Sequence, residues 1–263
     1  WQAATLNDHH YFFQRGYLPL VFTGTNTFES ISVHTGTTSG SQKANTVLAA
    51  YGRLWTADTP TNKTTVYFSD VLDGTDWSTG TAGSLDISGV LTQGMDEIVA
   101  LGAHNGFLII FCKNNIIVYS DGDNFQTGMT TTSLTLVEVI EGVGCVARDS
   151  VQSTGEDILF LSTSGVRSLS RTIQEKSQPL RDISKNVSDD IIQALEFENI
   201  DNIKSVYSPS NSFYLISFPT TFQTFCFDTR APLQDGSFRA TLWTAVPPKG
   251  YLTVGSSLFY AEI

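Results

Sequence analysis

Several side chains in this sequence are of the types that hydrolyse glycosidic bonds. Glycoside hydrolysis of the sialidase kind needs an arginine cluster, a tyrosine nucleophile and an acid. Residues of these types are Arg53, Arg148, Arg167, Arg171, Arg181, Tyr51 and Glu97. No sequence motif groups them, and a chain of this length contains such a set by chance. We therefore assign no catalytic residue, and glycan processing stays an alternative function.

Residues that could bind a metal ion have incomplete spacing. Asp121, Asp123 and Asn124 offer oxygen ligands, but the alternating series of a calcium loop and its downstream glutamate are missing. The histidines are His9, His10, His34 and His104. None lies in an HExxH motif or in an i, i+4 pair. The sequence predicts no metal site and no cofactor.

The three cysteines have no metal-ligand spacing. They are Cys112, Cys145 and Cys226, and the first and last lie inside apolar runs. An odd number within apolar segments predicts buried, reduced thiols.

The charge balance is acidic. The chain has 15 lysines and arginines against 26 aspartates and glutamates, for a net charge of −11. Such a balance disfavours a surface that binds nucleic acid, since affinity for nucleic acid comes mainly from basic side chains that neutralise phosphate groups. The only basic local stretch consists of Arg148-Asp149 and the segment from Arg167 to Arg181, which includes Lys176. It is interpreted as a solvated loop or a subunit contact, with a nucleic-acid-facing patch as the alternative.

No apolar run approaches the ~20 residues that span a bilayer, and no signal peptide is visible. We expect no membrane insertion by this segment. The chain begins at Trp1 and ends inside a strand-like run, so it is interpreted as a fragment of a longer chain.

The candidate residues above lie among repeated strand–turn–strand units. In the clearest unit, the apolar residues 107–112 and 116–119 flank a polar turn, as in a β-hairpin. The runs are continuously apolar, which predicts sheets buried on both faces. Similar pairs are 18–23 with 28–33, 53–57 with 65–69, 158–161 with 166–169, 213–218 with 224–227, and 251–254 with 258–260.

The six turns centre about 46 residues apart on average, which is the spacing of propeller blades. Further strands are expected at 46–50, 97–101, 134–140 and 203–207. Three or four short strands per period is the anatomy of a blade. The sequence therefore predicts an all-β fold: a β-propeller over 1–263 of about six blades, each a three- to four-stranded antiparallel sheet. Five blades plus a flanking hairpin is the alternative, because the first and last pairs are the shortest or most irregular.

One short helix is expected to interrupt the strands, at about 188–197. Ser188 is the expected N-cap, and Asp189 and Asp190 suit the positive end of the helix dipole. Segments 35–45 and 171–187 are expected to be loops.

Two turns share the pattern Asp-Gly-x-x-aromatic directly after an apolar strand. They lie at 73–77 and 121–125. The aspartate accepts backbone N–H bonds, the glycine allows a positive φ, and the aromatic ring anchors the turn. The pattern is similar to the Asp-box turns of sialidase-like propellers, although here the glycine follows the aspartate directly. We interpret both turns as structural.

One further set of residues runs through the middle of the chain, at 50–57, 65–70, 76–77, 85–87, 96–101, 105–114 and 117–119, with 142–145 and 155–166 continuing into the next unit. Together these residues resemble the propeller of the tail nozzle (tail tubular protein B-like) proteins of short-tailed bacteriophages. The match is clear over roughly 47–170.

The resemblance implies a structural virion protein, assembled in the host cytoplasm into a homohexameric ring of the phage tail. Its implied partners are the tail adaptor and tail fibre proteins, and DNA would pass through its lumen without sequence-specific binding. The resemblance implies no catalytic residues in this chain. Besides the sialidase-like enzyme, a carbohydrate- or receptor-binding propeller stays an alternative, with Trp77 and Trp243 as candidate ligand-stacking residues.

Overall fold

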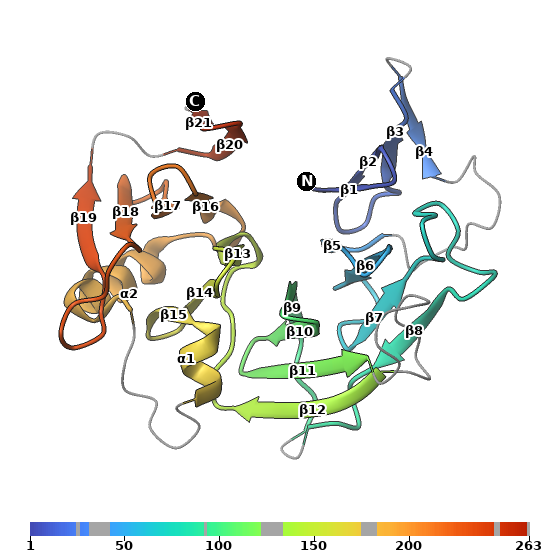
Figure 1. The fold of residues 1–263 in the computed structure, drawn as a ribbon, viewed down its shortest axis with the longest axis horizontal. Helices are drawn as coiled ribbons and strands as arrows, with labels where there is room; N and C mark the ends of the chain where they lie inside the picture. Colours follow the sequence, from blue (N-terminus) through green and yellow to red (C-terminus); the bar gives the residue numbers. More distant parts are fainter. Residues whose placement is uncertain are drawn as a thin grey trace. The chain divides into compact units, whose positions relative to one another are not determined.

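The computed structural model describes residues 1–24, 27–31, 43–91, 94–121, 134–174, 183–244 and 248–261 (Figure 1). The chain divides into two compact units, Trp1–Val143 and Gly144–Ile263. Short antiparallel sheets dominate both units. Among the described residues, no helix has the length and apolar character needed to cross a membrane.

The first unit contains three four-stranded sheets. The first sheet consists of β1 (Gln2–Leu6), β2 (His9–Phe13), β3 (Leu20–Phe22) and β4 (Phe28–Ser30). The second consists of β5 (Thr46–Ala50), β6 (Arg53–Ala57), β7 (Thr65–Phe68) and β8 (Gly83–Asp86). The third consists of β9 (Ile98–His104), β10 (Phe107–Cys112), β11 (Asn115–Asp121) and β12 (Leu134–Glu141).

The second unit contains a three-stranded sheet, a four-stranded sheet and a two-stranded hairpin. Its strands are β13 (Gln152–Ser153), β14 (Ile158–Ser162) and β15 (Gly165–Ser168); β16 (Lys204–Ser208), β17 (Phe213–Phe218), β18 (Gln223–Asp228) and β19 (Arg239–Trp243); and β20 (Gly250–Val254) with β21 (Ser257–Ala261). Its helices are α1 (Leu169–Gln174) and α2 (Ser188–Phe197), with 3₁₀ turns at Arg148–Ser150, Lys185–Val187 and Ile200–Asn202.

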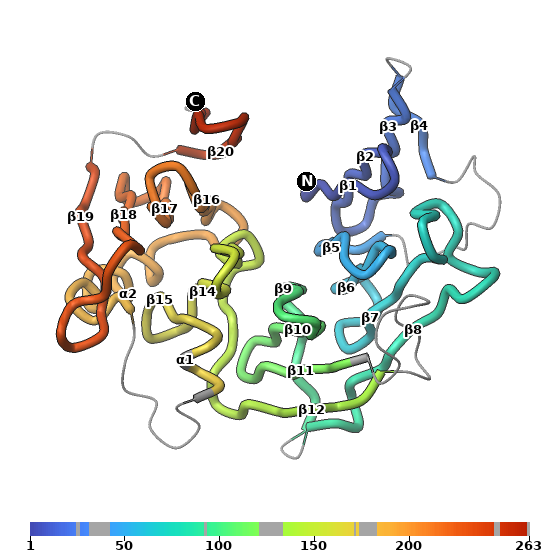
Figure 2. Tube along the Cα trace, viewed as in Figure 1, coloured from blue at the N-terminus to red at the C-terminus, as the bar shows by residue number. Residues whose placement is uncertain are grey.

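Every sheet runs in chain order, with each strand antiparallel to the next. The course can be followed by colour within each unit of Figure 2. Such meanders are the blades of β-propellers, which agrees with the all-β propeller class predicted from the sequence. That one propeller covers the whole of 1–263 stays a prediction.

The predicted number of about six blades is wrong. Among the described residues, five sheets have three or four strands, while β20 and β21 form a hairpin alone. The apolar pattern of this hairpin matches the inner strands of a blade, but a pattern of side chains does not reveal whether outer strands flank it. The pair predicted at 18–33 corresponds to the last two strands, β3 and β4, of the first sheet. The first two strands of that sheet, β1 and β2, carry polar residues and were not predicted.

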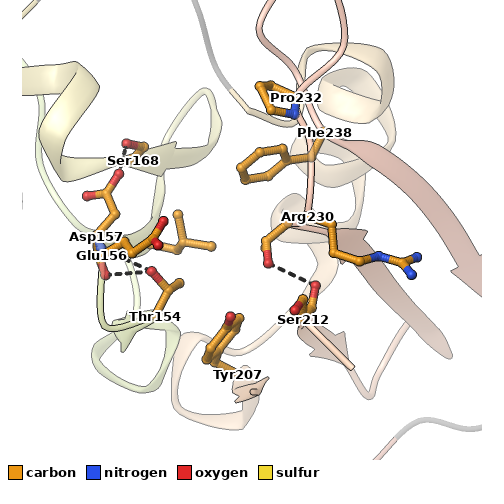
Figure 3. A pocket seen from close by; sticks show the side chains of 11 residues that line it. Thr154, Glu156, Asp157, Ser168, Tyr207, Ser212, Arg230, Pro232 and Phe238 are labelled. Atoms are coloured by element: carbon orange, nitrogen blue, oxygen red, sulfur yellow. Dashed lines mark hydrogen bonds between the residues drawn. The ribbon is translucent and has the colours of Figure 1, made fainter. Parts of the chain in front are cut away.

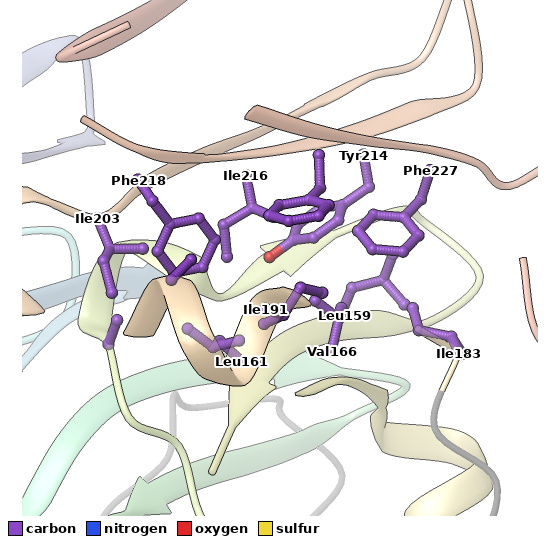
Figure 4. Close-up of a cluster of buried hydrophobic side chains, with 13 residues drawn as sticks. Leu159, Leu161, Val166, Ile183, Ile191, Ile203, Tyr214, Ile216, Phe218 and Phe227 are labelled. Atoms are coloured by element: carbon purple, nitrogen blue, oxygen red, sulfur yellow. The ribbon is translucent and has the colours of Figure 1, made fainter. Parts of the chain in front are cut away.

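Strands that are apolar on both faces require sheets to stack. In the first unit the first strand of each sheet contacts the first strand of the next, β1 with β5 and β5 with β9. In the second unit β13 contacts β16, and β16 contacts β20. Figure 4 shows the core of the second unit, where Tyr214, Ile216 and Phe218 of β17 pack towards Leu161 of β14 and Ile191 of α2. The predicted burial of both sheet faces is confirmed for the inner strands, such as β6 and β10.

The helix predicted at 188–197 is confirmed, but its expected cap is wrong. Ser188 is itself helical, with φ −60° and ψ −42°, and no side chain caps the helix. The preceding 3₁₀ turn already orients the backbone, and the Ser188 hydroxyl donates back to the carbonyl of Lys185. The loop predicted at 171–187 is partly helical, because α1 continues directly from β15 to Gln174.

Polar side chains placed just before the first strand of a sheet hold its central turn. Asn45, before β5, donates to the carboxylate of Asp58 (2.9 Å), which follows β6. Asp96, before β9, accepts from the backbone N–H of Asn114 (2.8 Å) and from the side chain of Asn115 (2.9 Å), at the turn between β10 and β11. Both carboxylates are buried.

The second unit repeats this arrangement with a glutamate. The buried Glu198 precedes β16, and its carboxylate accepts from the backbone N–H (2.7 Å) and the hydroxyl (2.6 Å) of Thr220, in the turn between β17 and β18. We call these three contacts the turn clamps. Their residue types differ (Asn–Asp, Asp–Asn and Glu–Thr), so they were not visible as a sequence repeat.

We predict that Asp96→Ala destabilises the first unit by about 2 kcal/mol, because it removes the buried carboxylate that accepts hydrogen bonds from Asn114 and Asn115, and hydrogen bonds to a charged group are the stronger ones. Urea unfolding followed by circular dichroism measures the change. The adjacent Glu97→Gln breaks only the exposed ion pair with Lys113 and serves as the control, with an expected loss below about 1 kcal/mol. Equal losses for the two variants would contradict the clamp.

Candidate functional site

A pocket of about 540 Å³ opens in the second unit (Figure 3). Its lining comes from the turn before β14, from the strands β14, β15 and β16, and from the segments that flank β17 and β18. The lining residues are Thr154, Glu156, Asp157, Leu159, Ser168, Tyr207, Ser212, Thr229, Arg230, Pro232 and Phe238. Hydroxyls and carboxylates make most of its wall polar, and two aromatic rings add apolar surface.

One wall of the pocket is a tight turn that carries two adjacent carboxylates. Thr154 and Asp157 close the turn, with the Thr154 N–H donating to the Asp157 carbonyl (2.8 Å) and the Asp157 N–H donating to the Thr154 hydroxyl (3.0 Å). The Asp157 carboxylate accepts from the backbone N–H of Ser170 (2.9 Å), in the first turn of α1, and from the Ser168 hydroxyl. Asp157 therefore holds the start of α1, while Glu156 lies exposed beside it.

Arg230 lines the pocket, but its guanidinium is directed away from the other side chains drawn in Figure 3. It forms a two-pronged pair with Asp228, at 2.8 and 2.5 Å. The hydrogen bonds from Arg230 lower the pKa of Asp228 to about 2. The charge of Arg230 is thus matched outside the pocket.

The residues with sialidase-like chemistry have separate local partners. In the first unit, Tyr51 donates its hydroxyl to the carbonyl of Phe107 (2.8 Å), and burial raises the pKa of Tyr51 to about 12. Glu97 pairs with Lys113 at 2.8 Å. Arg53 donates to the carbonyl of Ser69 and to the hydroxyl of Thr81. The described residues of this unit therefore show no arginine cluster around a tyrosine and an acid.

The arginines of the second unit are also locally bound. Arg148 makes a two-pronged pair with Asp149 (2.6 and 2.7 Å). Burial acts to raise the pKa of Asp149, but the hydrogen bonds and charges of Arg148 and Lys204 outweigh it and hold the pKa below its usual value. Arg167 donates to the hydroxyls of Ser162 and Ser164. The side chain of Arg171, and all of Arg181, lie outside the described residues.

Arg53 is fully buried and organises the turn that follows β7. Its guanidinium donates to the carbonyl of Ser69 (2.6 Å) and to the hydroxyl of Thr81 (2.6 Å). Thr81 in turn donates its hydroxyl (2.6 Å) and its backbone N–H (2.9 Å) to the carboxylate of Asp70. Gly80 has φ +60°, and a Cβ there would lie 2.3 Å from that carboxylate. The turn is a closed structural network.

The Asp-Gly-x-x-aromatic turn at 73–77 is structural, but the positive φ expected of its glycine is wrong. Gly74 is required by space instead, since a Cβ there would lie 2.5 Å from the side chains of Leu54 and Tyr11. Asp73 accepts from the backbone N–H of Thr75 (2.8 Å), and the Trp77 ring donates to the carbonyl of Gly74 (2.9 Å). Trp77 is only 6% exposed and packs edge-on against Phe13, so it is unavailable for stacking on a ligand. Trp243 at the end of β19 is 42% exposed. The second such turn, at 121–125, extends beyond the described residues.

No metal centre is found in the part of the chain that the structure describes. Two of the possible calcium ligands, Asp123 and Asn124, lie outside the described residues, as does His34. His9 and His10 belong to β2, where His10 bonds to the Thr5 hydroxyl (2.8 Å) and stacks on Phe22. His104 ends β9 and bonds to the Asn105 amide (2.9 Å).

The predicted burial of the three thiols is confirmed, as Cys112, Cys145 and Cys226 are all buried. Burial raises the pKa of Cys145 to about 12 and also raises the pKa of Cys226. Such thiols stay protonated near neutral pH and are poor nucleophiles.

Sequence reasoning did not single out Glu156, Tyr207, Arg230 or Phe238, which line the pocket. They lie in separate segments, and no local spacing connects them.

Searches for related proteins found neither a matching family model nor a curated relative. Among solved structures, the chain is similar to a protein from Lactobacillus plantarum (12% identity, 91% of this chain and 68% of that one, TM-score 0.48) and to Hsv2 from Kluyveromyces lactis (12%, 92% and 71%, TM-score 0.48). It is also similar to PorZ, a surface component of the type-IX secretion system of Porphyromonas gingivalis (11%, 99% and 30%, TM-score 0.49). At this level of similarity the three structures carry no argument about function, and the fold assignment rests on sheet topology.

We predict that the Asp70 turn loses stability in acid. Hydrogen bonds from Thr81 lower the pKa of Asp70, so the carboxylate stabilises the fold above its usual pKa, near 4, and this contribution is lost as the pH falls below that value. Asp70→Asn should lower stability by about 1 kcal/mol at pH 7, and by less at pH 3. Urea midpoints at both pH values measure the difference.

The control is Asp8→Asn, in the exposed turn between β1 and β2, where asparagine also suits the positive φ. The urea midpoint of this variant should equal that of the wild type at both pH values. A deficit of Asp70→Asn that is as large at pH 3 as at pH 7 would refute the role of the carboxylate.

Proposed function

We propose that this chain is a structural propeller of a phage tail nozzle, a ring through which DNA leaves the virion. The resemblance over 47–170 names the family, and the hydrogen-bonded roles of Tyr51, Arg53, Arg148 and Arg167 accord with a structural part. The ring is a homohexamer in this proposal, joined to tail adaptor and tail fibre proteins.

The observation that carries an assembly role is an apolar sheet face that no described residue of the second unit covers. In the hairpin β20–β21, Tyr251 and Leu258 pack towards Val206, Leu215 and Cys226.

The opposite face of this hairpin carries Leu252 and Phe259, which pair directly across the two strands, and Val254 on the same side. These three side chains are 61%, 54% and 57% exposed. A hairpin that is apolar on both faces is expected in a packed assembly, since exposed apolar surface of this kind marks interaction sites. We assign this face to the contact between neighbouring copies of the chain.

The acidic charge fits a channel for DNA. With a net charge of −11, a lumen formed by such chains repels the phosphate backbone, so DNA slides through it without binding. A basic lumen would hold the DNA instead.

A carbohydrate- or receptor-binding propeller is the second candidate. The polar pocket with its two aromatic rings and the exposed Trp243 favour it, because ligand sites combine such rings with a few polar groups. The sialidase-like enzyme has no comparable observation in its favour.

We predict that the full-length protein forms a closed ring whose channel admits duplex DNA, as seen by electron microscopy. The double variant Leu252→Ser, Phe259→Ser should lose the ring, because it removes most of the apolar contact, and light scattering should report the mass of a single chain. Phe197→Ser, at the exposed end of α2, removes an aromatic side chain that is more exposed than Phe259, and it should keep the ring.

A monomeric full-length protein that hydrolyses a sialoside would overturn the proposed function. A ring that survives the double variant would overturn only the assignment of the β20–β21 face as the contact.

A further inference from the structure

We propose that the pocket of the second unit binds a basic side chain, lysine or arginine, presented by a loop of a partner protein. This inference goes beyond the nozzle proposal by naming the chemistry of a partner, and it does not depend on ring formation. It stands on the charges of the wall, the direction of Arg230, the two aromatic rings and the size of the space.

The charges that face the pocket are negative. Glu156 and Asp157 are adjacent on one wall. Among the described residues, none donates a hydrogen bond to Glu156 or forms an ion pair with it, so its carboxylate is open to a ligand. Asp157 is held by Ser168 and Ser170, yet it still contributes its charge.

The basic residue of the lining does not neutralise these carboxylates. Figure 3 shows the Arg230 guanidinium turned away from Glu156 and Asp157. It is engaged by Asp228 and lies 5.8 Å from the centre of the Phe213 ring. The pocket therefore keeps a net negative charge, which disfavours a phosphate or carboxylate ligand and favours a cation.

Two aromatic rings stand on the other sides of the same space. In Figure 3 the Tyr207 and Phe238 side chains lie apart from each other around the opening, with the carboxylate wall to one side. Ring faces attract ammonium and guanidinium groups, more strongly where water is excluded. Acidic groups together with aromatic rings thus select a basic organic group over a simple metal ion.

The space fits a side chain together with the backbone that carries it. About 540 Å³ lies within the range of pockets for molecules much larger than one ammonium group. The hydroxyls of Thr154, Ser212 and Thr229 line the same pocket and offer acceptors for the remaining N–H groups of the ligand. A loop residue of a partner protein meets these requirements.

The test is titration of the full-length protein with the capped tripeptide Gly-Arg-Gly, followed by calorimetry and by NMR shifts. The neutral Gly-Gln-Gly is the matched probe. We expect binding of Gly-Arg-Gly that weakens in 0.5 M salt, and about three- to fivefold weaker binding by Glu156→Gln. Glu156 is exposed at the tip of a turn, so this variant should fold normally.

The control is Glu196→Gln, which removes the same charge from the exposed surface of α2 and should leave the affinity unchanged. Tyr207→Leu should weaken binding while keeping an apolar side chain at that position. Equal affinity for the two tripeptides, or equal effects of the two glutamate variants, would overturn the proposal. So would tighter binding of a neutral disaccharide, which would instead support the carbohydrate-binding alternative.

Discussion

The fold depends on where the backbone polar groups of its central turns find partners. Central hairpins such as β10–β11 are apolar on both faces, so the turn that joins their strands lies at the edge of a packed stack of sheets. In two sheets a buried carboxylate just before the first strand accepts from a backbone N–H of this turn, as Asp96 does from Asn114 and Glu198 does from Thr220. In a third sheet the contact joins two side chains, Asn45 and Asp58. Because a buried polar group without a partner costs about 1–3 kcal/mol, these turn clamps fix the first strand against the central pair.

Stacking follows from the same apolar strands. A strand such as β10 is buried on both faces only if a sheet lies on each side of it. This need is met wherever the first strands contact each other, as β5 does with β9 and β16 with β20. On the far face of β20–β21 it is not met by any described residue of the second unit. That unmet need is the physical basis for proposing a protein that works in an assembly.

Most of the side chains whose types could support catalysis or ligand binding instead form hydrogen bonds that hold turns. Arg53, Asp70 and Thr81 form one closed network, and Trp77 anchors the neighbouring turn. The pocket of the second unit differs because Glu156 is left open and Arg230 is directed elsewhere. This acidic, aromatic pocket is the basis for proposing that the chain holds a basic side chain of a partner protein.

The sequence by itself determined the features that depend on near neighbours. The hairpins at 107–119 and 213–227, the helix at 188–197 and the anchored turn at 73–77 follow from apolar runs, turn residues and short hydrogen bonds within a few residues. Tertiary structure alone decided the rest. Strands β1, β2 and β19 have weak patterns of their own and form because a neighbouring strand offers a ladder of hydrogen bonds. The pocket joins Glu156, Tyr207 and Phe238 from distant segments, and only folding brings together groups that share no local spacing.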